Sequence, residues 1–113
     1  MRVKATAKFL RHSTRKTRLV TQSIIGMPVA QANALLKHMT QGPARDVAKV
    51  LSSAAANAEN NHDLAPDDLY VVEATANEGP TLKRFHPRAQ GRAFAIHKPM
   101  THVTVVVENR EAR

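Results

Sequence analysis

The sequence predicts an α+β fold in which three helices pack against a three-stranded antiparallel sheet, from which a long β-hairpin protrudes. Three segments alternate polar and apolar residues with the period of two that is typical of a strand. Between the first and the second of these, three segments carry apolar residues at helical spacing. A polar and basic stretch of 23 residues, 77–99, joins the last two strands. The length of 113 residues predicts a single domain, residues 1–113.

The first expected strand covers Arg2 to Leu10. Successive side chains of a strand point to opposite faces of a sheet, so one face should pack in the core and the other should be cationic. The outward residues would be Arg2, Lys4, Thr6 and Lys8, and the inward residues would be Val3, Ala5, Ala7 and Phe9.

A first helix is expected after Ser13, which occupies the position of an N-cap residue. Gly26 and Pro28 should end this helix. Its residues at helical spacing are Leu19, Val20, Ser23 and Ile24.

Two further helices should follow. The second runs from Val29 to Met39 and ends before the pair Gly42 and Pro43. The third begins after Pro43, has high helix propensity, and should end where the polar run Asn60 to Asp63 breaks it. Its small residues permit close packing against a sheet, and its apolar stripe consists of Val47, Val50, Leu51, Ala54, Ala55 and Ala58.

Two valine-rich strands are expected at Leu69 to Ala76 and at Met100 to Val107. The residues between them, Asn77 to Pro99, are too polar to add much core, and a long antiparallel hairpin is the most economical connection. Arms of about twelve residues at roughly 3.3 Å per residue would reach about 40 Å. Gly91 is a plausible turn. A two-stranded ribbon is only marginally stable by itself, so we expect its partner to order it.

Basic and acidic residues are segregated along the chain. The formal net charge is +8, from 17 Lys and Arg against nine Asp and Glu, and the pI is near 10.7. Residues 1–45 carry nine basic and no acidic side chains, residues 46–79 carry one and seven, and residues 80–107 carry five and none. A merely soluble surface of high pI would mix the two signs. The acid-free stretches instead indicate a polyanionic partner, a nucleic acid.

The composition argues against several other classes of protein. Cysteine is absent, so disulfides, thiolate metal sites and thiol nucleophiles are excluded. The N-terminal residues lack the apolar stretch of a secretory signal, and no segment approaches the apolar length that spans a bilayer. We therefore expect a cytoplasmic protein without a membrane partner.

Catalysis is also disfavoured. The six histidines could supply general acids and bases, but none accompanies a nucleophile motif. Asp67, Asp68 and Glu73 could hold a divalent ion in principle, yet they lack a ligand loop. No glycine-rich phosphate loop is present. The sequence therefore predicts a binding protein with no catalytic residue, no metal and no cofactor.

Four stretches closely resemble the bacterial large ribosomal subunit protein 22 family over nearly the full length of the chain. They are STRKTRLV at 13–20, LSSAAANAENN at 51–61, NEGPTLKRFHPRAQGRA at 77–93 and HKPMTHVTVVV at 97–107. The resemblance implies a protein of the cytoplasmic ribosome that binds large-subunit ribosomal RNA and supports assembly, beside neighbouring large-subunit proteins. Its hairpin would line the exit tunnel and meet the nascent peptide.

Candidate RNA contacts come partly from the charge pattern and partly from this resemblance. The resemblance places a tunnel-lining tip at Arg88, Ala89, Gln90, Gly91 and Arg92. The full set of expected RNA-binding residues is Lys4, Lys8, Arg11, Ser13, Arg15, Lys16, Arg18, Lys83, Arg84, Arg88, Arg92, His97 and Lys98.

The chain departs from the family pattern at three positions, of which Pro99 matters most. The family usually has Pro where Thr14 stands, a basic residue where Gln90 stands, and Lys-Arg where Pro99 interrupts the strand. Proline cannot donate a ladder hydrogen bond, so the second arm of the hairpin should bulge or begin at Pro99.

Two alternatives remain open from the residues alone. Bases could stack on Phe85, His86 or Phe94, but the small aromatic content favours binding through shape and phosphate contacts. An architectural DNA-binding protein could also grip a groove with a basic ribbon. Such a protein usually needs a dimer core, and the sequence offers no apolar dimer face, so we expect neither DNA nor a second copy as a partner.

Overall fold

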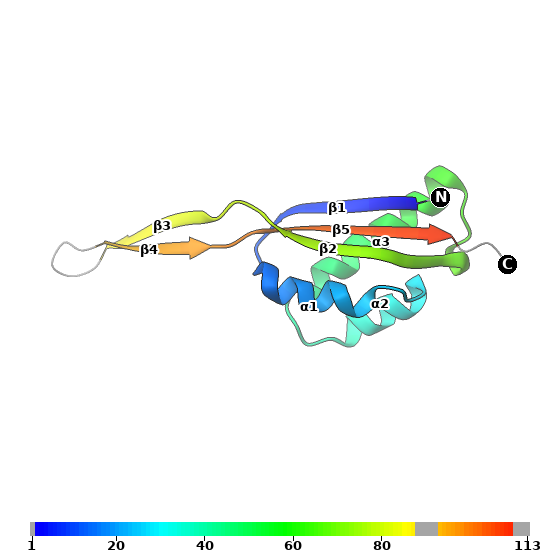
Figure 1. The fold of residues 1–113 in the computed structure, drawn as a ribbon, viewed down its shortest axis with the longest axis horizontal. Helices are drawn as coiled ribbons and strands as arrows, with labels where there is room; N and C mark the ends of the chain where they lie inside the picture. The colour runs from blue at the N-terminus through cyan, green and yellow to red at the C-terminus, as the bar shows by residue number, and fades with distance from the viewer. Residues whose placement is uncertain (1, 88–92, 110–113) are drawn as a thin grey trace.

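A computed structural model describes the backbone of residues 2–87 and 93–109 and the side chains of residues 2–81 and 99–109. Figure 1 shows a body of helices and strands from which a two-stranded ribbon projects along the long axis. The predicted α+β class, with three helices and a three-stranded sheet, is confirmed. The elements in chain order are β1 (Arg2–Leu10), α1 (Thr14–Ile24), α2 (Val29–His38), α3 (Pro43–His62), η1 (Pro66–Asp68), β2 (Leu69–Glu78), β3 (Leu82–Pro87), β4 (Ala93–Lys98) and β5 (Thr101–Asn109).

The sheet of the body is antiparallel and has β5 as its central strand, with β1 on one side and β2 on the other. Arg2 pairs with Glu108, and Leu69 pairs with Asn109. Side chains alternate between a buried and a more exposed face, as the period-two pattern predicts. The buried face is formed by Val3, Ala5, Leu69, Val71, Ala74, Ala76, Val103, Val105 and Val107.

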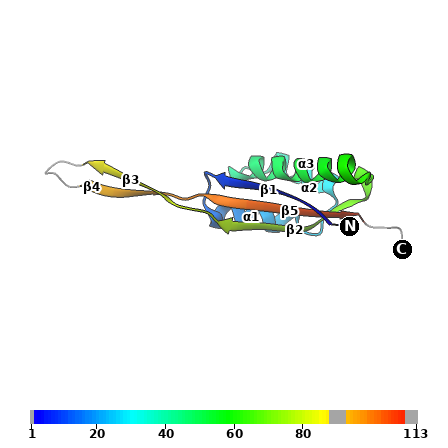
Figure 2. The ribbon, with the colours of Figure 1, turned by 90° about the horizontal axis from the view of Figure 1, so that it is seen from above.

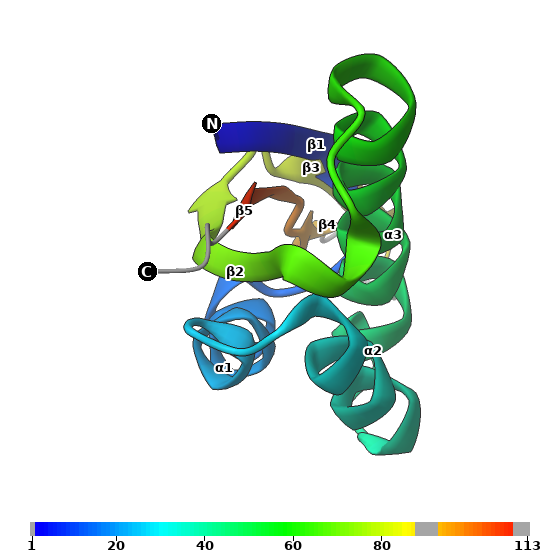
Figure 3. The same ribbon diagram turned by 90° about the vertical axis from the view of Figure 1, so that its right-hand side faces the viewer.

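All three helices contribute to a single core with this face. Figure 2 shows α3 running alongside β1, and Figure 3, which looks along the strands, shows α1 next to β2. Ala54 and Ala58 of α3 are fully buried, as are Val47 and Leu51. The small alanines let α3 approach the sheet closely, and the predicted stripe is confirmed as the core face apart from Ala55, which is half-buried.

Helices α2 and α3 and strands β2 and β5 have boundaries that differ from the prediction. Helix α3 continues through Asn60 and Asn61 to His62, because asparagine weakens a helix only slightly. Asp63 ends it in the left-handed conformation at φ 53°, and its backbone N–H donates to the carbonyl of Ala58. Helix α2 ends at His38 instead of Met39, β2 extends past Ala76 to Glu78, and β5 spans Thr101–Asn109 instead of Met100–Val107.

The predicted inward position of Phe9 is wrong. The pairing of β1 with β5 shifts register between Ala7 and Leu10, which marks a β-bulge. Phe9 lies in this bulge with φ 63°, and its side chain is 56% exposed. A bulge breaks the alternation of faces, so a residue that the sequence pattern assigns to the core can turn toward solvent.

The hairpin arms β3 and β4 pair with each other in a sheet of their own, from Leu82 opposite Lys98 to Pro87 opposite Ala93. The projection gives the molecule principal extents of 69 × 26 × 18 Å. Pro99 lies outside both ladders, which confirms that the second arm is interrupted there. Three residues, 79–81, lie opposite two, 99 and 100, at this junction. The expected turn at Gly91 lies outside the described residues.

Candidate nucleic-acid interface

Strand β1 presents cations on the uncovered face of the sheet. Lys4 and Lys8 are exposed, as their alternation with buried Val3 and Ala5 predicts. Arg2 is also exposed, but it forms an ion pair with Glu108 at 3.5 Å. Lys4 and Lys8 therefore offer charge to an external anion, whereas part of the charge of Arg2 is balanced within the sheet.

Helix α1 adds a second group of cations at its N-terminal end. Its inward face is buried through Thr14, Thr17, Val20, Thr21 and Ile24. Arg15 and Lys16 lie on the exposed face, and the first turn contains no acidic residue. Positive charges at the N-terminal, positive end of the helix dipole destabilise the helix slightly. A phosphate bound there would remove this destabilisation.

Arg18 has a structural contact as well as a charge. Its Nε donates a hydrogen bond to the carbonyl oxygen of Ala76 at 2.9 Å, which ties α1 to β2. The side chain is exposed, so its remaining donors face solvent. Arg18 thus belongs to the cationic surface and also anchors the helix that carries it.

Ser13 lies at the N-cap position of α1, as predicted, but its side chain makes no capping hydrogen bond. Its backbone carbonyl accepts hydrogen bonds from the Thr17 amide at 3.0 Å and from the Thr17 hydroxyl at 2.8 Å. The exposed Arg11 precedes it in the link between β1 and α1. Arg11, Arg15 and Lys16 therefore sit within one short segment where the strand turns into the helix.

A buried network of hydroxyl groups fixes this segment to the base of the hairpin. The fully buried Thr101, the first residue of β5, donates to the carbonyl oxygen of His12 at 2.7 Å. Its oxygen lies 2.9 Å from the hydroxyl of Thr14, and because Thr101 already donates, Thr14 is the donor of this second bond. These two hydrogen bonds fix the N-terminal end of α1, and with it Arg15 and Lys16, in position relative to the base of the hairpin.

The predicted hairpin contacts are placed only by their backbone. Lys83 and Arg84 lie on β3, and His97 and Lys98 lie on β4. The register puts Lys83 opposite His97, so the sequence places basic or titratable residues on both arms of the ribbon. The predicted tip, Arg88 to Arg92 with Ala89, Gln90 and Gly91, lies outside the described residues.

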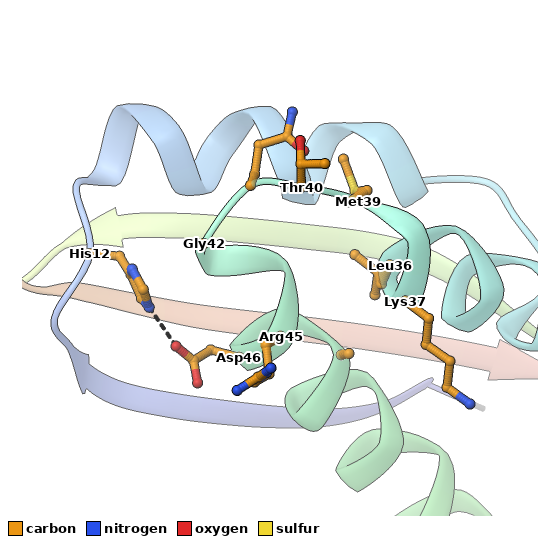
Figure 4. Close-up of a pocket in the computed structure, with 10 residues that line it drawn as sticks. His12, Leu36, Lys37, Met39, Thr40, Gly42, Arg45 and Asp46 are labelled. Carbon is orange, nitrogen blue, oxygen red and sulfur yellow. Dashed lines mark hydrogen bonds and ion pairs between the residues drawn. The ribbon is translucent and has the colours of Figure 1, made fainter.

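A pocket of about 640 Å³ opens between the β1–α1 link, the end of α2 and the first turn of α3. Figure 4 shows His12 and Asp46 pointing toward one another inside it. A hydrogen bond joins His12 Nε2 and Asp46 Oδ2, which are 2.5 Å apart. Lys37 and Arg45 line the same pocket and are exposed. Neither Lys37 nor Arg45 was predicted as an RNA contact, although both belong to the acid-free stretch 1–45 that could have indicated them.

The described residues carry no metal-ligand cluster and no membrane-spanning helix. Among the residues searched, no group of three or more His, Cys, Asp or Glu side chains could hold a metal ion. Every buried side-chain nitrogen or oxygen within the described ranges has a hydrogen-bond partner. In the same ranges, no helix has the length and apolar character to cross a membrane. What the surface does offer is exposed positive charge.

Comparison with known proteins gives one consistent result. The family model described as Ribosomal protein L22p/L17e matches residues 5–108. Large ribosomal subunit protein uL22 of Clostridium novyi (strain NT) is 53% identical over 110 residues, which cover 97% of this chain and 99% of that protein. The protein of the same name from Macrococcus caseolyticus (strain JCSC5402) is 52% identical over 113 residues, covering 100% of this chain and 91% of that protein.

Proposed function

The chain belongs to the family of ribosomal protein L22p/L17e, and from this premise we propose that it is a structural, non-enzymatic constituent of the large subunit of the cytoplasmic ribosome. Residues 1–113 act as one domain that binds large-subunit ribosomal RNA. The observation that carries the proposal is the set of exposed cations on β1, on the β1–α1 link and on the first turn of α1. These residues, called the cationic shoulder below, are Lys4, Lys8, Arg11, Arg15 and Lys16.

The cationic shoulder binds RNA mainly through phosphates. Among the described residues, no carboxylate forms an ion pair with any member of the cationic shoulder. Their charges are therefore available to a polyanion, and each phosphate that they neutralise releases bound counterions. Arginine adds a planar fork that fits phosphate oxygens, while lysine contributes a point charge. The exposed part of Arg18 and the half-buried Ser13 complete this contact.

The hairpin supplies a second contact surface. Its projection away from the body supports a role in reaching into RNA that the body does not touch (Figure 1). Lys83, Arg84, His97 and Lys98 contact RNA along the arms, and Arg88 to Arg92 line the peptide exit tunnel, where they meet the nascent chain. Neighbouring large-subunit proteins adjoin the body, and neither DNA nor a second copy of the chain is a partner.

Co-sedimentation tests the proposal directly. The full chain, expressed with an affinity tag in its own cells, should sediment with large subunits through sucrose gradients. It should also bind deproteinised large-subunit RNA saturably and much more tightly than a DNA duplex. Equal affinity for both nucleic acids, or absence from the subunit peak, would favour the alternative hypothesis of an architectural DNA-binding protein.

The tip should be functional without being structural. In the proposed role the tip contacts the tunnel and not the body, so exchanging Arg88 and Arg92 together for alanine is expected to change the unfolding free energy by less than about 0.5 kcal/mol. Contact with the nascent peptide should change, because two charges leave the tunnel wall. Thermal unfolding and photo-crosslinking of a stalled nascent chain measure the two effects, and a collapse of the whole domain would make these arginines structural.

A further inference from the structure

Phe9 occupies an unusual position for an aromatic residue. It is 56% exposed although it lies in a strand whose neighbours alternate toward the core. Its φ of 63° falls in the left-handed region, which bulky side chains rarely adopt because Cβ crowds the backbone. The body thus tolerates backbone strain at a residue that adds little to its core. Strained positions of this kind concentrate at functional sites.

The strained conformation is held by specific contacts. The backbone N–H of Phe9 donates to Nδ1 of His102 on β5 at 3.1 Å. The two rings meet edge to face, with centroids 5.0 Å apart and an interplanar angle of 88°. A Cβ added at Gly79 would lie 3.0 Å from Cε1 and 3.1 Å from Nε2 of His102. The absence of a side chain at Gly79 therefore makes room for the imidazole that positions Phe9.

The contact with His102 leaves part of the Phe9 phenyl ring free to contact another molecule. In an edge-to-face pair only one ring presents a face to the contact. At least one face of Phe9 therefore remains outside its contact with His102. Lys8 and Arg11, which flank Phe9 in the sequence and belong to the cationic shoulder, are both exposed.

We propose that Phe9 is a stacking platform for an unpaired nucleobase of the RNA, a proposal that rests on the function proposed above. Exposed aromatics beside lysine and arginine are the usual means of holding single-stranded nucleic acid. The base must be unpaired, because bases inside a duplex are stacked on their neighbours, whereas those in loops and bulges can be splayed onto a side chain. Lys8 and Arg11 add positive charge that suits a polyanion, and a protein partner is the alternative that the tests below distinguish.

Exchanging Phe9 for leucine tests the platform, because leucine stays apolar and has no aromatic face. The full-length variant should bind deproteinised large-subunit RNA more weakly by about 5- to 150-fold, the range expected when a base–aromatic stack is lost. Phe9→Tyr and Phe9→Trp, which keep an aromatic face, should bind within about twofold of the wild type. Ile25→Ala is the matched control, because Ile25 is an exposed apolar residue, 46% exposed, at the other end of α1.

A second measurement separates this proposal from the one on which it rests. Ultraviolet irradiation of the bound complex, followed by mass spectrometry, should find a nucleotide attached to Phe9. If Phe9→Leu binds as tightly as the wild type, the platform is overturned while the RNA-binding function stands. A crosslink from Phe9 to a neighbouring protein within intact subunits would also overturn it. A wild-type chain that fails to bind RNA at all would remove both proposals.

Discussion

RNA binding by the chain is expected to become much less sensitive to salt when Lys4, Lys8, Arg15 and Lys16 are all exchanged for glutamine. The logarithm of affinity falls with the logarithm of salt concentration by about 0.9 for each phosphate neutralised on a duplex. The loss of four contacts should lower this slope by about 3 to 4. Between about 50 and 200 mM salt, the wild type should therefore lose roughly a hundredfold more affinity than the variant.

The matched control keeps every charge and changes only its carrier. Lys4→Arg, Lys8→Arg, Arg15→Lys and Lys16→Arg together should retain the wild-type salt slope, because the number of neutralised phosphates is unchanged. Filter binding over a salt series measures both proteins. A glutamine variant with an unaltered slope would show that the cationic shoulder does not contact phosphate, and the RNA surface would have to be sought at Lys37, Arg45 and the hairpin.

The second large effect is expected at Thr101. Thr101→Val keeps the shape of the side chain but leaves the His12 carbonyl without its donor and the Thr14 hydroxyl without its acceptor. Because Thr101 is fully buried, water cannot replace these bonds without rearrangement. The free energy of unfolding should fall by about 1 to 3 kcal/mol, the usual cost of buried polar groups left unpaired. Urea denaturation measures this loss as a lower midpoint with an unchanged slope.

Thr104→Val provides the comparison on the same strand. Its hydroxyl pairs with that of Thr6 at 3.1 Å, but on the uncovered face of the sheet where solvent can substitute. The change in unfolding free energy should therefore stay within about 0.5 kcal/mol. Equal losses for the two variants would mean that the effect comes from valine in the strand and not from the network at the hairpin base.

The elements themselves could be predicted because local periodicity determines them. The alternation from Arg2 to Ala7, the apolar stripe of α3 except Ala55, and the interruption at Pro99 each depend on neighbouring residues, and each was confirmed. The predicted end of α3 was wrong because a polar run such as Asn60 to His62 disfavours a helix only weakly. The conformation of Asp63 decides that boundary, and it cannot be read from composition.

The sequence predicted which charged residues of the candidate site are exposed. It did not predict the hydrogen bonds that the residues of the site form with distant parts of the chain. The exposure of Lys4, Lys8, Arg15 and Lys16 follows from the strand and helix periods. Phe9 was misplaced because its bulge depends on a hydrogen bond to His102, which is distant in sequence. The bond from Arg18 to the Ala76 carbonyl is of the same kind. Long-range side-chain contacts with the backbone leave no periodic signal, so only the assembled fold reveals them.

The central place of β5 determines when the body can form. Both outer strands hydrogen-bond to β5 and not to each other, so neither β1 nor β2 can join the sheet before β5, Thr101–Asn109, has been synthesised. During synthesis, the ribosome therefore makes all three helices and both arms of the hairpin before any strand of the main sheet can close. Pairing between residues so far apart in sequence is slow, and valine-rich strands stay open meanwhile. A chain that stops before Thr101 lacks the strand around which the other two assemble.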